Sequence, residues 1–174
     1  ITLLLFYIGW KISGRPWFGG LIALLHTLNL GQLFFEANLL TETLTTFWIM
    51  PALAGLVWGA EMARDAHRPA RLVWLAAGIG VAAAAAVLTR PLFAYLPFWL
   101  AACLVCTWQP QPLGELRRSA GWQGLWQALR RVFWPLAAMT LAVALPVLGW
   151  VRFIHNTYGF LSLTVMTGYH LVQH

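Results

Sequence analysis

The chain has few charged side chains, and fewer still that are acidic. Of its 174 residues, 9% are charged and only five are Asp or Glu, whereas 60% are hydrophobic. An ordinary soluble domain carries about 25% charged residues, so this composition excludes an ordinary soluble domain. The sequence therefore predicts a membrane protein.

Cysteine is also scarce. Cys103 and Cys106 form a C-x-x-C pair inside an apolar stretch, with no second pair to complete a metal site. We interpret them as packing residues. The sequence has no Gly-rich nucleotide loop and no other His, Cys, Asp and Glu cluster with metal-ligand spacing. No cofactor is predicted, and a divalent metal stays open as the alternative.

An initiator methionine and a signal peptide are missing from the start of the chain. The sequence begins at Ile1 within an apolar run, without a charged leader region or a small-residue cleavage site. We interpret residues 1–174 as one transmembrane domain and expect it to be an internal part of a longer protein.

Charged or turn-rich breaks divide the chain into six apolar segments. A helix of about 18 residues is roughly 27 Å long, close to the ~30 Å hydrocarbon core, so each segment is able to cross once. The fourth and fifth segments joined as one helix would reach about 55 Å, so we expect a turn at Arg90, where Pro91 suits a new helix start. The predicted fold is an all-α, polytopic transmembrane helix bundle. Its segments are 1–10, 17–35, 43–60, 72–89, 91–108 and 132–150.

The basic residues are distributed unevenly between the two sides of this arrangement. Nine of the eleven Lys and Arg residues fall on one side, which the positive-inside bias identifies as the cytoplasm. We therefore predict a multi-pass protein of the inner (cytoplasmic) membrane. The net charge of +6 follows from this topology, so no nucleic-acid partner is needed. The nine are Lys11, Arg15, Arg64, Arg68, Arg71, Arg117, Arg118, Arg130 and Arg131.

Two stretches are predicted to have structural roles. Residues 114–131 carry Trp122, Leu125, Trp126 and Leu129 at helical spacing between paired arginines, which favours a helix lying in the cytoplasmic interface and contacting membrane lipids. Residues 78–87, GIGVAAAAAV, are small and should let a neighbouring helix approach closely.

The candidate site lies on the outer side, where Glu36, Glu42, Arg90 and Arg152 fall. Glu42 has two interpretations: a first-turn carboxylate after a Thr41 cap, which complements the helix dipole, or a functional charge at the membrane boundary. Arg90 is the only charge between Arg71 and Glu115. It either extends to lipid headgroups or pairs with a carboxylate, a lipid phosphate or a ligand, because a guanidinium matches phosphate geometry.

Three stretches together carry a resemblance to a known family: LLTETLTTFW (residues 39–48), LTRPLFAYLP (88–97) and WVRFIHNTYGFLSLTVMTGYHLVQH (150–174). In order and topology they resemble bacterial members of the dolichyl-phosphate-mannose protein mannosyltransferase-like group of GT-C glycosyltransferases. The resemblance implies transfer of a sugar from a polyprenyl-phosphate donor to a lipid, glycan or protein acceptor at the outer membrane face. It implies substrate-binding roles for Glu42, Arg90, Arg152, Asn156 and Tyr169, and it aligns Gly159, Thr164 and Gly168 with the same outer stretch.

His155 and His170 also fall on the predicted outer side, whereas a catalytic base does not. His155 is placed with the substrate-binding residues, and for His155 and His170 the alternatives are an acceptor, a metal or water. The family's catalytic aspartate belongs to its first outer loop, whereas the only Asp here, Asp65, is predicted to be cytoplasmic. We therefore assign no catalytic residue to this chain. A transporter or flippase and a non-catalytic assembly subunit are the alternative functions.

Overall fold

A computed structural model describes residues 1–29, 41–64, 69–108 and 113–163. Every secondary-structure element within these ranges is helical, as the sequence predicts. In chain order the elements are α1 (Thr2–Ser13), α2 (Pro16–Leu28), α4 (Thr41–Arg64), α5 (Pro69–Thr89), the 3-10 helix η1 (Pro91–Tyr95), α6 (Leu96–Thr107) and α7 (Leu113–Tyr158).

Three of these helices are long and apolar enough to cross a membrane: Thr41–Arg64, Ala70–Thr89 and Val132–Tyr158. The other expected crossings form shorter apolar helices, Thr2–Ser13, Pro16–Leu28 and Pro91–Thr107. The 12 residues of α1 span only about 18 Å, less than the ~30 Å hydrocarbon core. The structure thus gives three candidate spans where the sequence predicts six, and crossing by the shorter helices stays a prediction.

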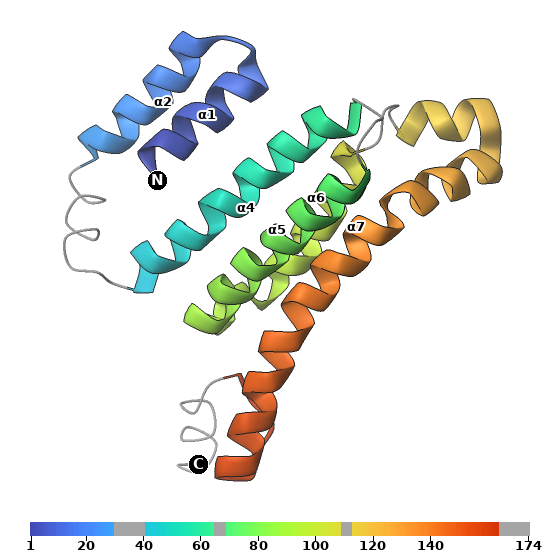
Figure 1. Cartoon of the computed structure of the whole chain (residues 1–174). Helices are drawn as coiled ribbons and strands as arrows, with labels where there is room; N and C mark the ends of the chain where they lie inside the picture. The colour runs from blue at the N-terminus through green and yellow to red at the C-terminus, as the bar shows by residue number, and fades with distance from the viewer. Residues whose placement is uncertain (30–40, 65–68, 109–112, 164–174) are drawn as a thin grey trace.

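Successive helices run in alternating directions (Figure 1). The ends of α1, α4 and α6 and the starts of α2, α5 and α7 lie at one end of the array, and the α5–η1 turn lies at the other end with the start of α4. We call these the inner end and the outer end, after the predicted topology. The described part of the chain therefore has the alternation on which the positive-inside argument depends, while the assignment of the inner end to the cytoplasm stays a prediction.

The expected turn at Arg90 is present. α5 ends at Thr89, and Arg90 has an extended backbone, with φ −142° and ψ 106°, before Pro91 starts η1. This conformation follows from the sequence because proline disfavours the helical region at the residue before it. The turn brings Arg90 to the outer end of the array.

The core forms where α4, α5, α6 and α7 pack together. Small residues of α5 allow a close approach, as predicted for residues 78–87: a Cβ added to Gly80 would lie 2.8 Å from Ala142 Cβ and 3.1 Å from Met139 Cα on α7. Trp108, after α6, is buried and donates from Nε1 to the carbonyl of Leu56 on α4, at 3.0 Å. The buried core includes Ala52, Leu56, Ala76, Ile79, Ala83, Leu100, Leu104 and Met139.

Helix α7 differs from the prediction in its continuity. Residues 114–131 are helical, as expected, but they belong to the same 46-residue helix as the last candidate span. Figure 1 shows the first part of α7 bending away from the rest. The expected interfacial helix is thus the bent beginning of α7 and not a separate element, and its place at the membrane surface stays a prediction.

Candidate functional site

Glu42 lies in the first turn of α4, at the outer end. Its carboxylate Oε2 accepts a hydrogen bond from the Thr41 hydroxyl at 3.3 Å. The helix already begins at Thr41, whereas an N-cap residue precedes the first helical residue. Thr41 is therefore not the expected N-cap, and its hydroxyl contacts the Glu42 carboxylate instead. A negative charge at this position complements the partial positive charge of the helix N-terminus.

Arg90 contacts this same carboxylate across the outer end. Its Nη2 lies 3.0 Å from Glu42 Oε1, and the side chains are 37% and 46% exposed, respectively. Of the partners considered for Arg90, the structure therefore shows the carboxylate. An ion pair this exposed contributes at most about 1 kcal/mol to stability, so stability alone gives little reason for it.

The pair leaves part of Arg90 available for another ligand. A guanidinium has five N–H donors, and within the described residues the recorded ion pair uses Nη2. The chain continues directly from Arg90 into exposed apolar side chains on η1 and α6, namely Leu92, Tyr95, Phe98 and Trp99. A cation beside an exposed apolar surface has the chemistry needed for an anionic headgroup with a hydrocarbon tail.

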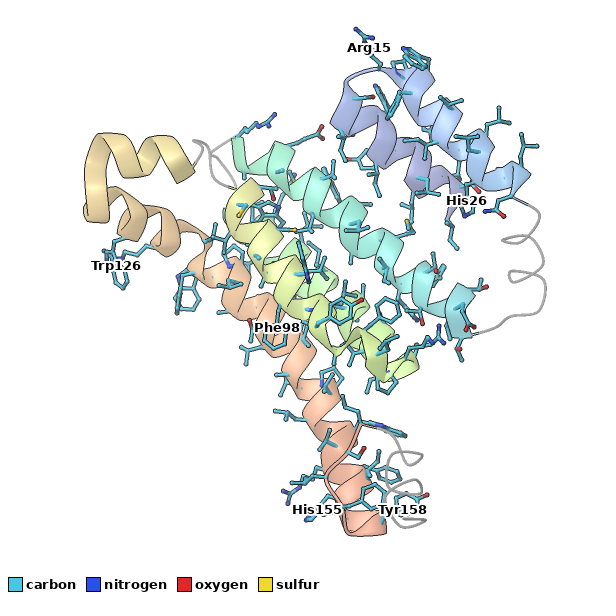
Figure 2. All side chains as sticks on the ribbon, turned by 180° about the vertical axis from the view of Figure 1, so that it is seen from behind. Arg15, His26, Phe98, Trp126, His155 and Tyr158 are labelled. Carbon is cyan, nitrogen blue, oxygen red and sulfur yellow. The ribbon has the colours of Figure 1, made fainter. Side chains whose placement is uncertain are left out.

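The remaining candidates lie on the last turns of α7. Arg152, His155 and Asn156 are all exposed, and no hydrogen bond or ion pair in the described part of the chain links them to Arg90 or Glu42. Figure 2 shows His155 and Tyr158 where α7 extends beyond the other helices. The candidate span Val132–Tyr158 has 27 residues, about 40 Å, against 20 residues, about 30 Å, for the span of α5. The extra length separates the two groups of residues.

The chain folds back after α7. Gly159 has a left-handed backbone, φ 80°, which ends the helix, and Trp150 Nε1 donates to the carbonyl of Leu163 at 3.0 Å. Tyr169, His170, Thr164 and Gly168 lie outside the described residues, as does Glu36.

A second ion pair was not anticipated from the sequence. Lys11 Nζ on α1 lies 2.7 Å from Glu61 Oε1 on α4, and it is also 5.5 Å from the ring centroid of Trp10. This pair is at the inner end, opposite the Glu42–Arg90 pair. The signal in the sequence that could have indicated it is an acid, Glu61, among the basic residues of the predicted cytoplasmic side.

The two cysteines do not form a metal site with other side chains of the described residues. Cys103 packs against the core and Cys106 is exposed, and both are free, which agrees with a packing role for Cys103. Among the described residues no group of three or more His, Cys, Asp or Glu side chains is arranged to hold a metal ion.

Comparisons with known proteins identify no relative. No protein-family model matches the chain, and neither a curated protein nor a solved structure does. The resemblance to GT-C glycosyltransferases therefore rests on the three sequence stretches that carry it.

Proposed function

We propose that this chain is part of an integral-membrane glycosyltransferase that transfers a sugar from a polyprenyl-phosphate donor to an acceptor at the outer membrane face. In this proposal Arg90 holds the donor phosphate. The observation that supports it best is the position of Arg90: a partly exposed guanidinium at the outer end, 3.0 Å from Glu42 and next to exposed apolar residues of η1.

The chemistry assigns Arg90 a role in both binding and reaction. A guanidinium binds phosphate through parallel N–H bonds, and this contact strengthens as negative charge develops on the departing polyprenyl phosphate. Proton abstraction from the acceptor hydroxyl requires a base. The family places that base in an outer loop, whereas Asp65, the one Asp of the sequence, is predicted to be cytoplasmic and lies outside the described residues. The proposal therefore gives this chain the phosphate-binding role only.

Glu42 is proposed to orient Arg90. The carboxylate is tied to Thr41 through Oε2 and to the guanidinium through Oε1, so it holds one edge of Arg90 and leaves further N–H donors for the phosphate. Arg152, His155 and Asn156 are proposed acceptor-side residues, on the extension of α7.

The test uses the full-length protein in membranes and a labelled polyprenyl-phosphate sugar. Arg90→Ala should reduce sugar transfer about a hundredfold, since losing a contact that strengthens in the transition state costs on the order of 3 kcal/mol. Arg90→Lys keeps the charge but loses the paired donors, so its activity should fall between those of wild type and Arg90→Ala. Glu42→Gln should cost less, because it weakens the orientation of Arg90 and leaves the cation in place.

Arg15→Gln is the matched control, because Arg15 is an exposed arginine beside α2 at the opposite end. It should transfer sugar at the wild-type rate at matched expression. Wild-type activity in Arg90→Ala would show that the arginine only contacts headgroups and would refute the phosphate site. Failure of the wild-type protein to consume any polyprenyl-phosphate sugar would instead favour the transporter or assembly-subunit alternatives.

A further inference from the structure

Three exposed side chains form a stripe where α7 bends into its candidate span. Trp126, Arg130 and Trp134 are spaced by four residues, and the two indoles are 65% and 69% exposed. At about 100° per residue, this spacing places all three within roughly 80° of one helix face. Figure 2 shows Trp126 pointing outward from the first part of α7, away from the other helices. Arg130 therefore has an exposed indole one turn away on each side.

The stripe is positioned at the predicted membrane boundary. The apolar span of α7 begins at Val132, so Arg130 lies just outside it and Trp134 within its first turn. Tryptophan concentrates at the level of lipid headgroups, where its ring contacts acyl chains and its N–H contacts polar groups. One turn of helix is about 5.4 Å, so an arginine one turn beyond Trp134 is placed at the depth of the lipid phosphates.

The charge of this end identifies the partner. The ion pairs recorded among the described residues use Lys11 with Glu61 and Arg90 with Glu42, and Arg130 takes part in neither. Arg64 and Arg71 are further exposed cations at the inner end. An anionic headgroup complements these cations, whereas a zwitterionic one has no net charge to match them.

We propose that the Trp126–Arg130–Trp134 stripe binds an anionic phospholipid of the cytoplasmic leaflet. Arg130 binds the lipid phosphate, Trp134 contacts the glycerol and upper acyl region, and Trp126 contacts the headgroup one turn farther from the apolar span. This site is independent of the proposed sugar-transfer site, which lies at the other end of the helices.

The test titrates phosphatidylglycerol, and separately phosphatidylcholine, into the purified full chain in detergent and counts bound lipids by native mass spectrometry. Arg130→Gln should raise the apparent Kd for phosphatidylglycerol about fivefold, which corresponds to ~1 kcal/mol for one basic residue near the lipid. Binding of phosphatidylcholine should not change. Arg130→Lys should retain most of the affinity for phosphatidylglycerol because it keeps the charge.

Arg15→Gln is the control here too, since Arg15 is an exposed cation of the same end without an exposed indole four residues to either side. It should bind phosphatidylglycerol like wild type. Equal weakening in Arg15→Gln and Arg130→Gln would assign the effect to general surface charge, and unchanged affinity in Arg130→Gln would exclude the arginine. Either result overturns the proposal, provided that circular dichroism shows unchanged helicity.

Discussion

Replacing Gly80 by alanine should weaken the packing of α5 against α7. Gly80 lies at a close contact between the two helices, and an added Cβ would be 2.8 Å from Ala142 Cβ and 3.1 Å from Met139 Cα. Two carbon atoms prefer about 3.5–4.0 Å. Because Met139 contributes backbone atoms to this contact, rotation of a side chain cannot relieve it, and one helix has to move.

The expected cost follows from the displacement. Restoring an ordinary contact between the added Cβ and Ala142 requires one helix to move by roughly 0.7 Å. Such a movement opens gaps between neighbouring side chains, and a gap of about 0.5–1 Å loses roughly a quarter to a half of their dispersion attraction. Overpacking of this kind typically costs about 1–3 kcal/mol. We therefore expect Gly80→Ala to lower the free energy of unfolding by about 1–3 kcal/mol.

Gly78 provides the matched control. It lies on the same helix two residues earlier, and a Cβ added there meets nothing within 4 Å. Gly78→Ala should be neutral or stabilising by up to ~1 kcal/mol, because alanine favours the helix more than glycine does. The assay is SDS titration of the purified proteins in mixed micelles, followed by circular dichroism and tryptophan fluorescence. Equal stability of the Gly80 and Gly78 variants, or greater loss in Gly78→Ala, would refute this packing of α5 on α7.

Two further predictions concern topology and the core. Both native cysteines are first replaced by alanine. Thr157→Cys should then react with a membrane-impermeant thiol reagent in intact cells and Arg64→Cys should not, because the basic end is predicted to face the cytoplasm. The reverse labelling would place the candidate site on the cytoplasmic side and contradict the predicted topology. Trp108→Phe should lower the free energy of unfolding by about 1–3 kcal/mol, since it removes the buried hydrogen bond to the Leu56 carbonyl and leaves a cavity. Wild-type stability in the same SDS titration would contradict that contact.

The sequence by itself determined the features that depend on local chemistry and length. The helical, apolar character follows from composition, and the turn at Arg90 follows because one helix over residues 72–108 would be about 55 Å long. The run of small residues at 78–87 predicted the close helix contact that is found at Gly80. None of these features depends on which helices are neighbours.

The tertiary structure decided which residues meet. The sequence left a carboxylate, a phosphate and a ligand as partners of Arg90, and only the packing of α4 beside α5 brings Glu42 to 3.0 Å. In the same way, the contact between α1 and α4 pairs Lys11 with Glu61. The extension of α7 past its neighbours separates Arg152 from Arg90, because helix lengths and crossing positions are properties of the assembled array. Charge and periodicity mark a residue as needing a partner, whereas the identity of that partner is fixed by contacts between segments far apart in the chain.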